Sequence, residues 1–569
     1  MAIFGTSFQI GRSALQAYQT ALAVSGQNIA NLGNADSARQ SARLAALHGG
    51  RTAGGIAPGA GVLVTGLERH VDAAVEARLR AALGSRSGAG TLHTQLGRIE
   101  GLYNELTDTD LSTQLSHFFG SFADLQTDPN EPATRSRVLA AADALLRTLQ
   151  RQRSGLVDQH GDLNGSLQEA VRQADALARQ IAELNGQIVV QEAGAHGGAG
   201  ALRDRRDAAL RQLAELMDIQ SREQPNGVVN VYVGSEPLVD GTRARSLRTS
   251  QDVADGLRRL TVRFADTNSP VPVRDGMLAG LVQARDTHVR GQIDRLDRLG
   301  RGLIYEVNRL HSTGQGLIGY TTLTSRYPVA AANVPLNSPA AGLPFPVEHG
   351  TFLVRVRDRA TGQVTTHQVA VDLDGLGDDD TTLASLARAL DDLPGLVAAT
   401  TVDGRLELKA DGGYELAFAE DSAGVLAALG LAGFFEGDSA ATIAVQAAVR
   451  GDPRRIAASL SGAPGDGANA GRLSGVGATA SRLLDGRSIL AYHALMTDEL
   501  AVATAAAETG REAADAVYSS LLAQREAVSG VNLDEEVLNL TKFERSFQGA
   551  ARYLTVLDSL SAEVLSLVR

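Results

Sequence analysis

The sequence contains no cysteine and no tryptophan among its 569 residues, and aromatic residues make up only 4% of it. The absence of cysteine excludes disulfide bonds, thiolate metal sites and cysteine nucleophiles. Only Lys409 and Lys542 are lysines, so nearly all of the basic side chains are arginines. The formal net charge of -12 argues against nucleic acid as a partner, because phosphates recruit lysine and arginine.

Long apolar runs are also missing. No stretch approaches the ~20 apolar residues that a membrane span needs, so we expect no membrane span. The N-terminal residues MAIFGTSFQIGRSALQAYQ have neither a basic region nor an unbroken apolar core. They do not resemble a cleavable secretory signal. We expect a soluble protein, and an export route with an uncleaved signal remains open.

The N-terminal segment has the pattern of a helix. Apolar and small residues alternate spacings of three and four, as on a coiled-coil face: Leu15, Tyr18, Leu22, Ser25, Ile29 and Leu32. The glycine-rich stretch Gly49 to Val62 interrupts this pattern. Helical patterns resume near Val71 and continue, with breaks, to about Glu192.

The interior changes from helix to strand and back. From Asn226 the apolar period falls to two, which predicts a β-hairpin region over about 226–275. Helix returns and ends before a proline-rich passage, 327–350, which holds five of the 15 prolines and reads as a boundary. A compact mixed module follows, with alternating strands and one helix at TTLASLARAL. Beyond Arg472 the chain is predicted to be helical to its end.

The C-terminal segment contains three adjacent acids, Asp534, Glu535 and Glu536. Clustered carboxylates can bind a metal, but neighbouring residues point in different directions around a helix. Asn532 is a good N-cap and Glu535 lies three residues later, as in a capping box. The helix dipole also favours acids in the first turn. Helix initiation is therefore the preferred interpretation.

A mostly apolar stripe with the same three–four spacing continues through this helix at Leu540, Phe543, Phe547, Ala550, Leu554, Leu557, Ser561, Val564 and Val568. At ~1.5 Å per residue the helix is a rod of roughly 50 Å, too long to cover its stripe against a small terminal domain. The N-terminal stripe is the obvious partner within the chain. Either stripe could equally pack against other subunits.

No pattern in the sequence recommends an enzyme. The stretch GQGLIG, 314–319, matches a dinucleotide fingerprint, but a helix rather than a strand precedes it. The acidic stretch DLDGLGDDD, 372–380, has Leu383 where a calcium loop needs its last glutamate. The 11 histidines include no pair three or four residues apart. We therefore expect no cofactor, no metal and no catalysis.

The two ends of the chain resemble the flagellar axial proteins. ALAVSGQNIANLGNADSARQ is similar to the S-x-N-I-A-N motif of the rod–hook family, and GVNLDEEVLNLTKFERSFQGAARYL is similar to the C-terminal signature of hook and hook-associated proteins. One departure is that Asp36, Ser37 and Ala38 stand where the family usually has a Gly-Tyr pair. Interior blocks such as LQTDPNEPATRSRVL resemble the hook-associated protein 1 family more specifically, and the resemblance covers essentially the whole chain.

The resemblance implies a structural role at the junction between the flagellar hook and filament. The chain would be exported through the flagellar type III apparatus without a cleavable signal and would lie outside the cell. Its expected partners are further copies of itself in a ring, hook protein, hook-associated protein 3, and an export chaperone at the C-terminal helix. The assembly interface would comprise Leu15, Tyr18, Leu22, Asn28, Ile29, Asn31, Leu32, Leu533, Val537, Leu540, Phe543, Phe547, Ala550, Leu554 and Leu557.

These observations predict a mainly α fold with inserted β structure and nested domains. Residues 1–61 and 530–569 would form terminal coiled-coil helices, and 62–325 with 450–529 a rod of long helices. Residues 326–449 would form a small β-rich α+β outer domain. One alternative is another axial protein, namely hook protein, a rod protein or hook-associated protein 3. The others are an axial protein with an enzymatic insert and a generic coiled-coil scaffold.

Overall fold

The computed structural model describes residues 2–48, 59–103, 110–193, 198–254, 256–377 and 379–567. Contacts within the chain gather into two compact units. Unit 1 comprises residues 1–95, 161–285 and 505–569, and unit 2 comprises residues 96–160 and 286–504. Three long helices contribute residues to both units: α2 (Ala73–Tyr103), α4 (Pro132–Glu192) and α12 (Ile489–Ser529).

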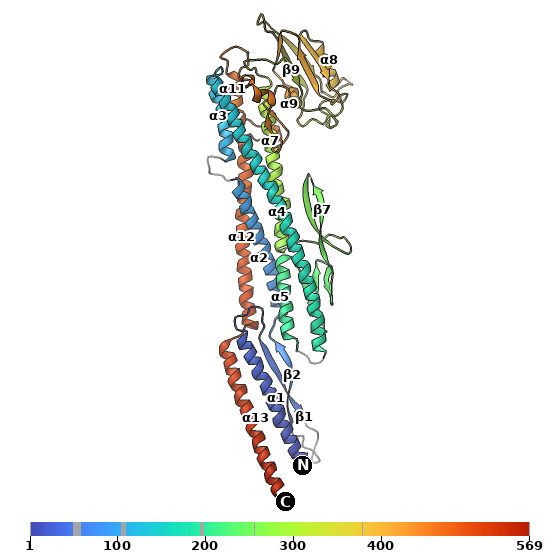
Figure 1. Ribbon diagram of the computed structural model, residues 1–569, viewed down its shortest axis with the longest axis vertical. Coiled ribbons are helices and arrows are strands. Elements are labelled where there is room, and N and C mark those ends of the chain that lie inside the picture. Colours follow the sequence, from blue (N-terminus) through green and yellow to red (C-terminus); the bar gives the residue numbers. More distant parts are fainter. Residues whose placement is uncertain are drawn as a thin grey trace. The chain divides into compact units, whose positions relative to one another are not determined.

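The terminal part of unit 1 joins two helices and a hairpin (Figure 1). Helix α1 (Ala2–Ala30) contacts both α13 (Leu533–Leu567) and the antiparallel pair of β1 (Gln40–His48) and β2 (Gly59–Arg69). The expectation of helix up to the glycine-rich stretch was wrong, because residues 40–48 form a strand. Most of that stretch, residues 49–58, lies outside the described residues.

The remainder of unit 1 packs helices against small sheets. Along the second half of α4, buried residues recur every three or four positions, as a helix with one core face requires: Leu163, Leu167, Val171, Ala174, Ala178, Ile181, Leu184 and Ile188. The other elements are α5 (Gly200–Leu216), β3 (Gln220–Glu223), β4 (Val229–Val233), β5 (Glu236–Asp240), β6 (Arg243–Ala244), β7 (Leu247–Ala254), β8 (Leu257–Phe264) and α6 (Gly276–Gln283). Strands β3 to β6 form one antiparallel sheet in sequence order, and β7 pairs with β8.

The helical part of unit 2 is built around a cluster of phenylalanines. Phe118 and Phe122 of α3 (Leu111–Thr127) lie 5.8 Å from the ring of Phe434, centroid to centroid, and all three are fully buried. Helix α7 (Arg290–His311) follows a π-helical turn and contacts α11 (Ala468–Ser474) and α9 (Val425–Leu429). A short helix, α10 (Ala447–Gly451), precedes the segment that leads to α11.

Buried polar side chains hold irregular backbone in unit 2. Arg135 of α4 is 1% exposed and donates to the carbonyl oxygens of Pro129 at 2.8 Å and Ile456 at 2.7 Å. The carboxamide of Asn308 accepts from the N–H groups of Phe434 and Phe435 at 2.8 and 2.9 Å. These bonds satisfy backbone groups that water cannot reach.

The mixed module of unit 2 contains two three-stranded sheets, ordered β11-β10-β14 and β12-β13-β9. The side chain of Thr382 caps α8, and Ser385 returns the bond to its backbone, which completes a capping box. The elements are β9 (Thr322–Thr324), β10 (Gly350–Asp358), β11 (Val364–Val371), α8 (Leu383–Asp391), β12 (Leu396–Thr400), β13 (Leu406–Ala410), β14 (Tyr414–Ala419), β15 (Phe435–Glu436) and β16 (Ala444–Val445). Among the described residues, no helix combines the length and apolar character that crossing a membrane requires.

Candidate assembly interface

The two terminal helices pack closely because a glycine lies at their contact. A Cβ atom on Gly11 of α1 would come 2.5 Å from Leu554 Cδ2 and 3.3 Å from Tyr553 Cδ1 of α13. Such distances are shorter than side chains tolerate, so the absence of a side chain at position 11 allows this approach. Gly11 itself is buried. The pair therefore depends on a small residue facing a large one.

The residues expected at the interface divide into three groups by burial. Asn28 and Leu557 are buried, with 4% and 8% exposure. Leu32, Leu533 and Val537 are exposed. The remainder are half-buried, at Leu15, Tyr18, Leu22, Ile29, Asn31, Leu540, Phe543, Phe547, Ala550 and Leu554. Apart from Asn28, the buried positions that the structure describes on α1 are small, namely Gly11, Ala17, Ala21 and Ser25.

Helix α13 carries a second apolar stripe whose side chains remain largely uncovered in the described chain, although Tyr553 also borders Gly11 of α1. Tyr553, Val556, Leu560 and Val564 are 40–55% exposed and recur at spacings of three, four and four. At 100° per residue this stripe lies about 100° around the helix from the stripe of Phe543, Phe547 and Leu554. The sequence pattern had assigned Val564 to the first stripe, together with Val568, which lies outside the described residues. Tyr553, Val556 and Leu560 were missed because the first stripe already accounted for the helical period.

The N-terminal motif residues Asn28 and Gln40 clamp the start of the hairpin to α1. The Asn28 side-chain amide donates to the Gln40 carbonyl oxygen at 2.8 Å. Its oxygen accepts from the Gln40 N–H at 3.1 Å. One carboxamide thus bonds both backbone groups of Gln40, the first residue of β1, which is also paired with Arg69 of β2. The predicted motif residue Asn31 differs, because its side chain donates to Gln27 within the same turn of chain.

Arg39 connects this segment to the start of α13. Its guanidinium lies 3.0 Å from Glu535 and 2.8 Å from Glu536, and Glu536 is 2% exposed. Its backbone N–H donates to the Ser529 carbonyl oxygen at 3.0 Å. The Asn532 side chain accepts from the N–H groups of Asp534 and Glu535 at 2.9 and 3.4 Å. The acids thus begin a helix and also form ion pairs, a role that the sequence interpretation omitted.

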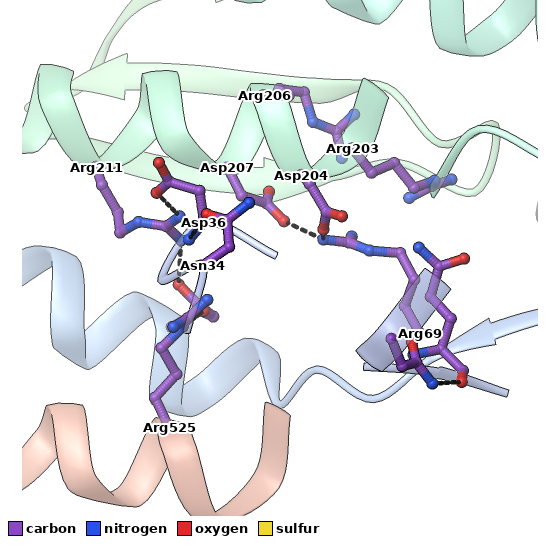
Figure 2. Close-up of polar contacts among 12 residues, drawn as sticks. Asn34, Asp36, Arg69, Arg203, Asp204, Arg206, Asp207, Arg211 and Arg525 are labelled. Atoms are coloured by element: carbon purple, nitrogen blue, oxygen red, sulfur yellow. Dashed lines mark hydrogen bonds and ion pairs between the residues drawn. The ribbon is translucent and has the colours of Figure 1, made fainter. Parts of the chain in front are cut away.

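A cluster of ion pairs surrounds the base of the hairpin (Figure 2). Arg69, the last residue of β2, contacts Asp204 and Asp207 of α5, and Arg69 Nη2 lies 2.8 Å from Asp207 Oδ2. Burial opposes the charge on Arg69, but the two carboxylates outweigh it and raise its pKa. For Asp204 burial acts in the other direction. It raises the pKa of this carboxyl group, although the contact with Arg69 lowers it.

Arg211 of α5 and Arg525 of α12 complete this cluster. Arg211 lies 2.7 Å from Asp36 and 3.5 Å from Glu76, and Arg525 lies 2.8 Å from Glu76. Asp36 belongs to the stretch that departs from the family's Gly-Tyr pair. Its carboxylate faces Arg211 in Figure 2, so the departure introduces an ion pair at this point.

Two stretches considered for chemistry have other roles in the structure. GQGLIG follows α7, and the N–H of its last glycine, Gly319, donates to the Glu415 carboxylate at 3.1 Å. In the acidic stretch, of which Asp378 lies outside the described residues, Asp372 and Asp374 lie near His349, with ligand atoms within 4.8 Å of one another. His349 Nδ1 accepts from the Leu373 N–H at 3.2 Å, and exposed groups of this kind are common without an ion.

Comparisons with known proteins point to one family. A model of the flagellar hook-associated protein FlgK helical domain matches residues 96–323. Flagellar hook-associated protein 1 of Salmonella typhimurium is 27% identical over 98% of both chains. The same protein of Bacillus subtilis is 33% identical over 20% of this chain and 22% of its own.

A solved structure shares the fold. The flagellar hook junction protein FlgK from Burkholderia pseudomallei aligns with a TM-score of 0.52 at 15% identity, over 79% of this chain and all of that one. The helical-domain match and the full-length alignment point to the same family. Over 98% of its length, the chain is therefore similar to flagellar hook-associated protein 1.

Proposed function

We propose that this chain is a structural subunit of the bacterial flagellum that forms the junction between hook and filament. The relatives are named flagellar hook-associated protein 1, and the solved relative is described as a hook junction protein. The proposed mechanism is assembly by helix packing, without catalysis. Hook protein on one side and hook-associated protein 3 on the other are the proposed neighbours.

The observation that carries this proposal is the uncovered stripe on α13. Tyr553, Val556, Leu560 and Val564 expose apolar surface on a helix whose adjacent face already packs on α1. Contiguous exposed apolar surface marks interaction sites in soluble proteins. Complete burial of a fully exposed apolar side chain is worth ~1.5–3 kcal/mol. These four side chains are already partly covered, so each contributes part of that amount and the four together supply a driving force. A terminal helix of a neighbouring copy is the proposed cover.

Export is proposed to precede assembly. The similar proteins are flagellar hook-associated proteins, so the flagellar type III apparatus is the proposed export route. Helix α13 carries the uncovered stripe, which would be exposed before the subunit assembles. A dedicated chaperone bound to this helix would cover the stripe before export. The mature subunit would lie outside the cell, at the distal end of the hook.

The test replaces one residue of the uncovered stripe. Leu560→Asp should leave the subunit exported but unable to join hooks in a strain that lacks its own copy of the gene. Thr555→Asp is the matched control, since Thr555 is exposed on the same helix outside the stripe. Filaments are counted by electron microscopy, and the culture medium is probed for free subunit. Normal filaments on the Leu560→Asp strain would contradict the proposal.

A further inference from the structure

A cleft in unit 1 collects arginine side chains from several elements. It has a volume of about 540 Å³ and lies among α2, the end of β2, α5 and the strands β3 and β4. Four arginines line it, Arg69, Arg80, Arg203 and Arg206. Four carboxylates also line it, Glu76, Glu192, Asp207 and Glu223. The charges balance in number, so the pairing between them decides what the cleft can bind.

Each of the four carboxylates is bound by an arginine, but not every arginine of the cleft binds a carboxylate. Arg203 binds both oxygens of Glu192 at 2.9 Å and also contacts Glu223. Asp207 is held by Arg69 at 2.8 Å. Glu76 is held from outside the cleft by Arg525, at 2.8 Å. These contacts occupy all four carboxylates at hydrogen-bond distance.

Arg80 is left without a carboxylate at hydrogen-bond distance. The nearest carboxylate to Arg80 in the described chain is Glu76, at 3.8 Å, and it is shared with Arg211 and Arg525. Arg80 Nη2 donates to Ser221 Oγ at 3.0 Å, which is a neutral acceptor. Burial lowers the pKa of Arg80, with Glu76 opposing this only in part.

Arg206 is in a similar position and is more deeply buried. Only 1% of it is exposed, and Glu223 lies 3.6 Å from its Nη2. Its Nη1 donates to neutral oxygens of Asn185 and Gly227 at 3.2 and 2.6 Å. Its Nε is buried and has no hydrogen-bond partner among the described residues. A buried donor in this state costs free energy until a ligand or water satisfies it.

The two guanidinium groups reach the same face of β3. Arg80 contacts Ser221 and Arg206 lies beside Glu223, two residues further along the strand. Residues two apart on a strand point to the same side, ~7 Å from each other. A carboxylate or phosphate spans such a gap with its oxygens, and guanidinium groups bind both. We propose that this cleft is an oxyanion-binding site in which Arg80 and Arg206 receive a carboxylate or phosphate group.

Two sources could supply this group. One is a free anion, and the other is an acidic side chain of a second copy, since the chain carries a net charge of -12. Analytical ultracentrifugation distinguishes the free anion from the side chain of a second copy. The full chain is measured with and without inorganic phosphate at constant ionic strength. If phosphate lowers the oligomeric fraction of the parent but not of Arg80→Met, a neighbouring carboxylate occupies the cleft. If the oligomeric fraction is unchanged, the ligand is a free anion.

Binding itself is measured by calorimetric titration of the full chain with inorganic phosphate at constant ionic strength. The parent should bind with a stoichiometry of one, and Arg80→Met should weaken binding at least tenfold. Arg78→Met is the matched control and should bind as the parent does, because Arg78 is exposed on the same helix and donates to the Ala74 carbonyl oxygen at 3.4 Å. No binding by the parent, or equal binding by Arg80→Met, would overturn the proposal.

A second variant keeps the test decisive if Arg80→Met does not fold. Ser221→Glu places a carboxylate beside Arg80 from within the chain. It should abolish phosphate binding and raise the melting temperature above that of the parent. A Ser221→Glu protein that binds phosphate with the parent's affinity would also overturn the proposal.

Discussion

Arg39 Nε and Glu536 Oε1 lie 2.8 Å apart although 497 residues separate them in the sequence. The pair joins the segment between α1 and β1 to the first turn of α13, and Glu536 is 2% exposed. Breaking a buried ion pair leaves one charge without its partner in a poorly solvated place. The two ends of the chain are therefore held together by a contact that is sensitive to single substitutions.

The first prediction compares two adjacent acids. Glu536→Gln should destabilise the docking of α13 by about 3 kcal/mol, because it removes a buried charge that faces Arg39. Glu535→Gln should cost under about 1 kcal/mol, because the Glu535 side chain is 56% exposed and water screens its pair. Hydrogen exchange of the α13 amides measures both. Equal protection in the two variants would show that the Arg39–Glu536 contact does not hold the helix.

The second prediction concerns the contact between α1 and α13. Gly11→Val should separate the helices and cost about 1–3 kcal/mol, because its side chain would overlap Leu554. Gly26→Val is the control on the same helix, since a Cβ there meets nothing within 4 Å. Chemical unfolding monitored by helix content compares the two. Adding Leu554→Ala should restore part of the loss in Gly11→Val, and a purely additive double variant would argue against direct contact.

The third prediction is an acid-dependent loss of stability in unit 2. Burial lowers the pKa of His311 to about 4, although the hydrogen bond with the Ala432 carbonyl oxygen partly offsets this effect. The unfolded chain binds the proton with a pKa of about 6.5. The stabilising contribution of neutral His311 is therefore complete above about pH 6.5 and decreases as the pH falls toward 4. The difference corresponds to about 3 kcal/mol.

Denaturant unfolding between pH 7 and pH 4 measures this loss. In His311→Gln the pH dependence over that range should be smaller, whatever the variant's stability at pH 7. An unchanged slope in His311→Gln would show that another group is responsible for the acid sensitivity.

Helix periods and turn residues made much of this fold predictable. The stripe from Leu540 to Leu557 predicted α13, and the alternation of Val229, Val231 and Val233 predicted β4. The hairpin at residues 40–69 was missed, although Val62 and Val64 alternate as a strand requires. Its first strand, QSARLAALH, has the composition of a helix, and pairing with β2 overrides that preference.

The candidate interface was less predictable than the fold. Motif positions such as Asn28 and Arg39 could be recognised, but their partners Gln40 and Glu536 follow from tertiary packing. The uncovered stripe from Tyr553 to Val564 is legible only when the face toward α1 is known. The sequence around Arg80 and Arg206 does not predict the cleft. Whether an arginine has a carboxylate at hydrogen-bond distance depends on the folded chain and not on its neighbours in sequence.

Localising the subunit on isolated hook–filament structures tests the central claim most directly. Antibodies are raised against the mixed module, so neither terminal helix has to be altered. The bound antibodies are imaged by immunogold electron microscopy. The account predicts label confined to a narrow zone at the distal end of the hook, and no such label on the Leu560→Asp strain. Label along the whole filament, or in the cell body only, would contradict it.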